Sequence, residues 1–262
     1  MFMSLLRNKK VLLKPILKKF GKLRKPSLSL EEYLVSKAKE SWGYNGTKDR
    51  FKTIFFEHLQ KKPFRFLIKL RKEKPNVMFL GAGKGEALYQ FIKFSSKLKL
   101  NPIVDVFSFT KSLTKDVKSL VNKDYSSRTL FEHLNVKKSK FKFLENRYDL
   151  VVGAMSVGEH TYYPANAIFT SSLMLLKNGK AYIEVEDLRD RFTVKEYDAY
   201  ISYLKKFPKQ HHDELYYQKQ IDNLKIIFKR MVYSYNPKLE FSFKIIKNPK
   251  TAINFVEIER IK

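Results

Sequence analysis

Apolar residues after position 74 follow two spacings along the chain. Short apolar runs between glycine, proline or polar clusters predict buried strands, and apolar residues three and four positions apart predict helices. The predicted strands are 77–80, 103–107, 148–153 and 180–185, and the predicted helices are 87–97, most of 111–134, 165–176 and 193–205. A final pair, 239–246 and 252–261, predicts an antiparallel hairpin. Strands that alternate with helices predict an α/β fold with a mainly parallel sheet.

The first 74 residues have a different character. Residues 1–28 are predicted to be a basic tail or arm, because the first acid of the chain is Glu31. Residues 29–74 predict a helical extension, in which Ser29 and Glu32 have the spacing of a capping box. Residues 75–262 are then expected to form one domain.

The net charge of +27 is concentrated in this first part of the chain. Residues 1–74 carry 21 basic and 6 acidic side chains, which is 15 of the 27 excess positive charges. A field of this size attracts polyanions, so we expect a nucleic acid partner and favour RNA. An anionic membrane surface, or no specific partner, remains an alternative.

Composition excludes several kinds of chemistry. The chain has no cysteine, which excludes disulfides, cysteine-ligated metals and thiolate nucleophiles, and we predict no metal site. It has no apolar run of the length that a transmembrane segment needs. We expect a cytoplasmic location, or the mitochondrial matrix if residues 1–26 are a presequence.

The most informative segment is the apolar run 77–80 followed by Gly81, Gly83 and Gly85. A buried strand that turns sharply into a helix has this pattern. Glycine permits such a turn, and a ligand can lie directly against a backbone without Cβ atoms. The helix start adds amide groups and the positive end of the helix dipole. The segment therefore predicts a cradle for a nucleotide-type cofactor.

Three segments in this order resemble the class I S-adenosylmethionine-dependent methyltransferase superfamily. Residues 77–85 resemble its glycine motif, 148–153 its fourth strand, and 175–185 the turn into its fifth strand. The resemblance covers 75–262 and implies a Rossmann-like sandwich whose last strand is inserted antiparallel, with S-adenosylmethionine as cofactor. The implied cofactor-binding residues are Gly81, Ala82, Gly83 and Gly85, with Asp105 or Ser108 at the ribose.

The sequence also departs from that family. Phe79 stands where the glycine motif usually has an acid, and Ser108 where the second strand usually ends in one. Asp105 could replace the second acid if it lay at the strand tip, since burial without a partner would be costly. A dinucleotide-binding fold is the rival, but Glu86 stands where its fingerprint needs the third glycine.

The loop after the fourth strand faces the transferred methyl group in this family, and here it contains Glu159 and His160. These two residues are the catalytic acid/base candidates; their alternative role is to cap the next helix. The leading hypothesis is an S-adenosylmethionine-dependent methyltransferase that acts on RNA or an RNA–protein particle. The alternative is a catalytically silent RNA-binding or ribosome-associated protein on the same fold, and a nicotinamide-dependent oxidoreductase is the third. The sequence does not specify the oligomeric state.

Overall fold

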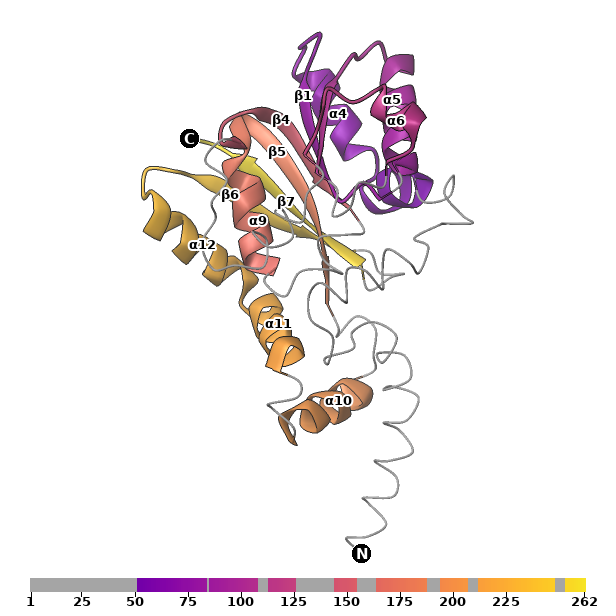
Figure 1. The fold of residues 1–262 in the computed structure, drawn as a ribbon. Coiled ribbons are helices and arrows are strands. Elements are labelled where there is room, and N and C mark those ends of the chain that lie inside the picture. The colour runs from indigo at the N-terminus through magenta and orange to yellow at the C-terminus, as the bar shows by residue number, and fades with distance from the viewer. Residues whose placement is uncertain are drawn as a thin grey trace, which may run out of the picture.

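The computed structural model describes residues 51–83, 85–107, 113–125, 144–154, 164–187, 194–206, 212–247 and 253–262. Its strands are β1 (Asn76–Leu80), β2 (Ile103–Phe107), β3 (Lys123–Asp124), β4 (Tyr148–Gly153), β5 (Leu175–Glu186), β6 (Phe241–Ile246) and β7 (Ile253–Arg260). Its helices are η1 (Thr53–His58), α4 (Lys62–Lys69), α5 (Glu86–Lys97), α6 (Lys115–Lys118), α9 (Pro164–Leu173), α10 (Val194–Lys206), α11 (His212–Asp222) and α12 (Leu224–Tyr235). Figure 1 shows these elements along the chain.

The seven strands form one sheet in the order β3-β2-β1-β4-β5-β7-β6. β1 pairs in parallel with β2 and β4, and β4 pairs in parallel with β5. β7 is antiparallel to both β5 and β6, so the C-terminal hairpin is inserted with its last strand inside the sheet. This arrangement confirms the predicted Rossmann-like methyltransferase fold.

Most predicted strands are confirmed, two helix predictions need correction, and two helices were missed. The helix predicted over 111–134 is wrong at Lys123–Asp124, which pair with β2 as strand β3. The helix predicted over 165–176 ends at Leu173, because Leu175 already pairs with Tyr148 of β4. Helices α11 and α12 were not predicted.

Two apolar layers cover the sheet, one on each face. Alternate residues of β1 enter different layers: Met78 and Leu80 pack with α9, α11 and α12, whereas Val77 and Phe79 pack with η1, α4 and α5. Alternation of this kind is the consequence of a strand buried on both faces. In Figure 1, α10 and the start of α11 extend away from these layers. None of the helices in the described part of the chain is long and apolar enough to cross a membrane.

An aromatic cluster ties residues 51–70 to the sheet. The ring centroids of Phe64 and Phe91 lie 5.1 Å apart, those of Phe79 and Phe91 5.0 Å apart, and those of Phe55 and Phe79 6.1 Å apart. Phe79 is therefore a buried contact between β1, η1 and α5. Residues 51–70 belong to the same core as β1, while the proposed division of the chain at 28 and 74 stays a prediction.

Candidate functional site

The carboxyl ends of the central strands meet at one edge of the sheet. Leu80, the last residue of β1, stands in register with Phe107, which ends β2, and with Gly153, which ends β4. Ligands of open parallel sheets bind beyond this edge. The glycine segment 81–85 begins there, directly after Leu80.

Three glycines turn the chain from β1 into α5 in the way that the sequence predicts. Gly81, Gly83 and Gly85 have φ of 73°, 56° and 92°, which is the left-handed region that glycine adopts without strain. The Gly81 N–H donates to the carbonyl of Phe107, and the Gly85 N–H donates to the carbonyl of Ala82 at 2.9 Å. The turn is thus fastened both to β2 and to itself.

The glycines at 83 and 85 are needed for different reasons. A Cβ added at Gly83 would have no atom of the described residues within 4 Å. A Cβ at Gly85 would lie 2.7 Å from Cγ1 of Val117 and 2.9 Å from Cδ2 of Leu113. Gly83 is therefore glycine for its backbone conformation, whereas Gly85 also allows Leu113 and α6 to pack against the loop.

The start of α5 adds a helix dipole to the cradle. Gly85 is the N-cap and has no side chain to bond the first amides, while its carbonyl accepts the Tyr89 N–H at 2.8 Å. Glu86 places a carboxylate in the first turn. That carboxylate would repel a pyrophosphate bound at the start of the helix, which disfavours a dinucleotide-binding site. A ligand that also carries positive charge would be favoured there.

Asp105 occupies the middle of β2, not the strand tip, so the expectation of a tip position is wrong. Its carboxylate is buried and accepts two hydrogen bonds, one from the Tyr148 hydroxyl at 2.7 Å and one from Asn122 Nδ2 at 2.8 Å. Burial, and then the bond and charge of Asp105, raise the pKa of Tyr148 far above its ordinary value. Tyr148 therefore stays a proton donor, and Asp105 joins β2 to β4 and to the residue before β3.

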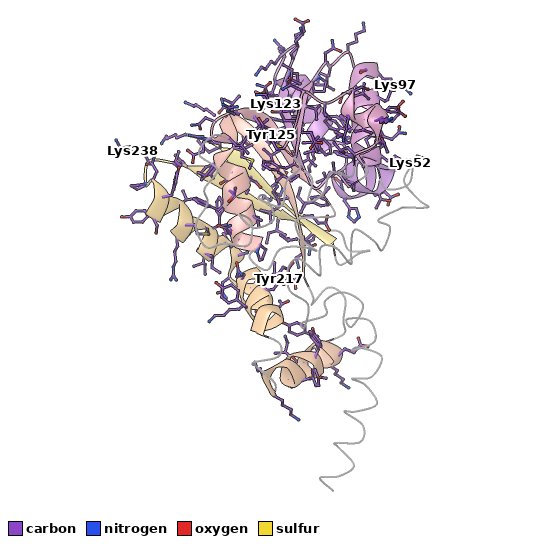
Figure 2. The ribbon with its side chains drawn as sticks, viewed as in Figure 1. Lys52, Lys97, Lys123, Tyr125, Tyr217 and Lys238 are labelled. Atoms are coloured by element: carbon purple, nitrogen blue, oxygen red, sulfur yellow. The ribbon has the colours of Figure 1, made fainter. Side chains whose placement is uncertain are left out.

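Tyr125 is an aromatic residue at this edge that the sequence did not single out. Its ring stacks on Phe107 with centroids 5.2 Å apart, and its N–H donates to the carbonyl of Val106. Figure 2 labels it next to Lys123 of β3. Tyr125 was not recognised because a helix was predicted over 111–134, whereas pairing of β3 with β2 brings Tyr125 beside β2.

Several predicted site residues lie outside the described residues: Ser108, Glu159 and His160. Ser108 follows Phe107 directly in the sequence, and Glu159 and His160 follow β4 by six and seven positions. Their roles at the ribose and in proton transfer stay predictions, as does the ribose role of Asp105. Among the described residues, no group of three or more histidine or acidic side chains could hold a metal ion.

Comparisons with known proteins find structures but no sequence relatives. No family model matches the chain, and no curated protein matches it. A Methanococcus maripaludis protein assigned to the S-adenosyl-L-methionine-dependent methyltransferases is 13% identical, with 83% of this chain and 93% of that chain covered and a TM-score of 0.41. The plantazolicin methyltransferase BpumL, in complex with SAH, is 14% identical with 89% and 98% covered and a TM-score of 0.45. The CurJ carbon methyltransferase is 10% identical with 99% and 70% covered and a TM-score of 0.49. Similarity at this level says nothing about substrate, and the fold assignment rests on the strand order above.

The different surroundings of Gly83 and Gly85 predict different losses of stability. Gly83→Ala places a side chain in the left-handed region without a close contact to the described residues, and should lower the free energy of unfolding by about 1 to 2 kcal/mol. Gly85→Ala adds the clash with Val117 and Leu113, and should cost about 2 to 4 kcal/mol. Urea denaturation of both variants measures the difference. Equal losses would contradict the separate roles assigned to the two glycines.

Proposed function

We propose that the protein is an S-adenosylmethionine-dependent methyltransferase that binds its cofactor on the backbone of Gly81, Ala82 and Gly83. The turn of positive-φ glycines at the edge where β1, β2 and β4 end together is the observation that carries this proposal. The position of β7, antiparallel between β5 and β6, supports this family over the dinucleotide-binding rival. The cofactor would supply an activated methyl group, and the protein would hold that group in line with the substrate nucleophile.

The remaining roles follow the same geometry. Gly85 does not contact the cofactor through a side chain; the lack of a Cβ lets Leu113 and α6 pack against the loop. Of the two ribose candidates we favour Ser108, which follows Phe107 in the sequence, since Asp105 is already hydrogen-bonded to Tyr148 and Asn122. Glu159 or His160 accepts the proton that leaves the substrate nucleophile, and His160 has the more suitable pKa range for a base near neutral pH.

We propose RNA, alone or in an RNA–protein particle, as the substrate, and the charge distribution is its support. Residues 51–74 carry eight basic and two acidic side chains, and Arg71 and Lys74 are among the exposed ones. The alternative is a catalytically silent RNA-binding protein that keeps the fold and the basic surface without methyl transfer. A cytoplasmic or mitochondrial location stays a prediction.

Titration calorimetry with S-adenosylhomocysteine tests the cofactor proposal. The wild-type protein should bind it, and Gly83→Asp should lose binding at least about tenfold, because a carboxylate then projects from the glycine loop that is proposed to hold the cofactor. Gly83→Ala is the control for the change of backbone conformation and should lose less. A folded wild-type protein that gives no heat would remove the methyltransferase proposal and leave the silent alternative.

The salt dependence of RNA binding tests the substrate proposal. Binding of a single-stranded RNA should weaken steeply with salt, and Arg71→Gln/Lys74→Gln should reduce the log–log slope by about 1.4, since each phosphate contact contributes about 0.7. Lys225→Gln/Lys229→Gln, which removes the same charge from α12, is the matched control and should change the slope less. Fluorescence anisotropy measures both. An RNA affinity that does not change with salt would contradict RNA binding both for the methyltransferase and for the catalytically silent alternative.

A further inference from the structure

A cleft lies between α4 and the strands β5 and β7. Its volume is about 480 Å³, within the usual range of small-molecule sites. Cationic side chains come from both sides, with Lys62, Arg65 and Lys69 on α4 and Lys180 on β5. Lys180 is in register with Leu150, three residues or about 10 Å before Gly153, where β4 ends beside the glycine loop, and β5 lies two strands away from β1.

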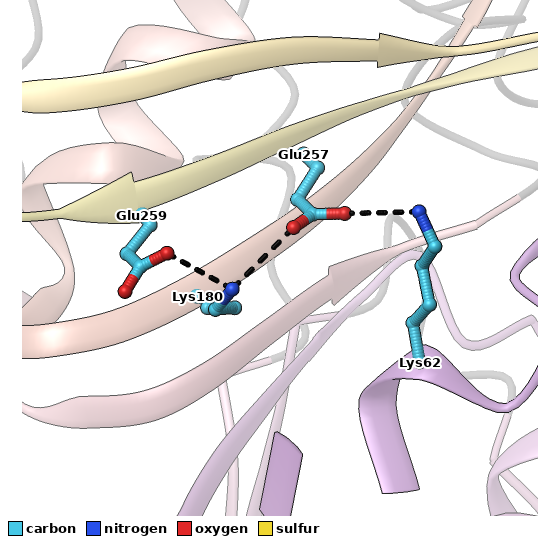
Figure 3. Close-up of polar contacts among 4 residues, drawn as sticks. All are labelled: Lys62, Lys180, Glu257 and Glu259. Atoms are coloured by element: carbon cyan, nitrogen blue, oxygen red, sulfur yellow. Dashed lines mark hydrogen bonds and ion pairs between the residues drawn. The ribbon is translucent and has the colours of Figure 1, made fainter. Parts of the chain in front are cut away.

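Two glutamates of β7 and two lysines form a chain of ion pairs in this cleft (Figure 3). Lys180 Nζ lies 2.9 Å from Glu259 Oε2 and 3.4 Å from Glu257 Oε1, and Lys62 Nζ lies 3.4 Å from Glu257 Oε2. Burial lowers the pKa of Lys180, but Glu259 and Glu257 outweigh it and the net pKa is raised. Lys180 therefore stays charged, and the two carboxylates are balanced by Lys180 and Lys62.

Arg65 and Lys69, the other two cations of the cleft, are not balanced by a carboxylate of the described residues. Lys62, Arg65 and Lys69 lie three and four positions apart, on one face of α4. Among the described residues, no carboxylate forms an ion pair with Arg65 or Lys69. Like charges at this spacing destabilise a helix, and a bound anion would remove the repulsion. The outer side of the cleft thus favours an anionic group.

The cleft also has an apolar wall, formed by Phe66, Leu70 and Tyr182. The Phe66 ring is partly exposed, and Lys180 Nζ lies 5.7 Å from its centroid. A flat ring is the ligand part that suits an aromatic face. The neighbouring carboxylates of Glu257 and Glu259 can accept hydrogen bonds from amino groups on such a ring, and they repel a polyanion that would run the length of the cleft.

We propose that this cleft binds a nucleoside phosphate. Arg65 and Lys69 hold the phosphate groups, Phe66 packs against the base, and Glu257 or Glu259 accepts a hydrogen bond from its amino group. This proposal does not depend on the methyltransferase proposal, because none of the residues that line the cleft belongs to the glycine loop. The protein then has two separate ligand sites, one at the carboxyl edge of the sheet and one on the face beside α4.

Titration calorimetry with magnesium-free ADP tests the site. Wild type should bind ADP with a Kd below about 1 mM, and Arg65→Gln/Lys69→Gln should weaken it at least about tenfold through loss of two charged hydrogen bonds. The matched control is Lys52→Gln/Lys97→Gln, which removes the same charge at exposed positions that do not line the cleft and are labelled in Figure 2. The control should leave the affinity within about twofold of wild type.

Two further titrations distinguish this site from the cofactor site. Saturating S-adenosylhomocysteine should leave ADP binding unchanged, and Gly83→Asp should bind ADP as wild type does. Inorganic pyrophosphate, which has no ring, should bind at least about tenfold more weakly than ADP. The proposal is overturned by absence of ADP binding, by equal weakening in the two double variants, by competition with S-adenosylhomocysteine, or by pyrophosphate that binds as well as ADP.

Discussion

Parallel pairing of β1 with β2 and β4 is the constraint on which the rest of the structure depends. The register brings Leu80, Phe107 and Gly153 to the same level, so three strand ends meet at one edge. Both faces of β1 are buried, and the chain can leave only by turning over that edge into α5. A reversal this tight requires positive φ at Gly81, Gly83 and Gly85, and it leaves backbone at the surface where a ligand can lie.

The same sheet shows what Phe79 and Asp105 do at positions where the sequence was compared with acids of the methyltransferases it resembles. Phe79 alternates onto the face of β1 that meets η1 and α5, where it contacts Phe55 and Phe91. Asp105 alternates onto the opposite face of β2, where Tyr148 and Asn122 bind it. Both positions serve the stability of the sheet. Under the methyltransferase proposal, cofactor recognition would therefore fall mainly on the backbone of the glycine loop.

The sequence predicted the central strands because each is a short, mainly apolar run between turn residues. β2 and β4 have the predicted bounds, and the hairpin of β6 and β7 is antiparallel as expected. β3 could not be predicted, since its two residues, Lys123 and Asp124, are polar and are strand only through pairing with β2. The partners of Asp105 were equally hidden, because Tyr148 and Asn122 are 43 and 17 positions away from it. The sequence therefore favoured the strand tip for Asp105, and only the fold shows the partners that permit its burial.

The central claim is that the backbone at 81–85 binds S-adenosylmethionine, and hydrogen–deuterium exchange tests it most directly. With S-adenosylhomocysteine at about 1 mM, peptides that span Phe79–Leu88 should exchange more slowly, because the ligand covers their amides. Peptides from β6 and β7, which lie at the other side of the sheet, should exchange at an unchanged rate. Unchanged exchange at Phe79–Leu88, or protection confined to another part of the chain, would contradict the account.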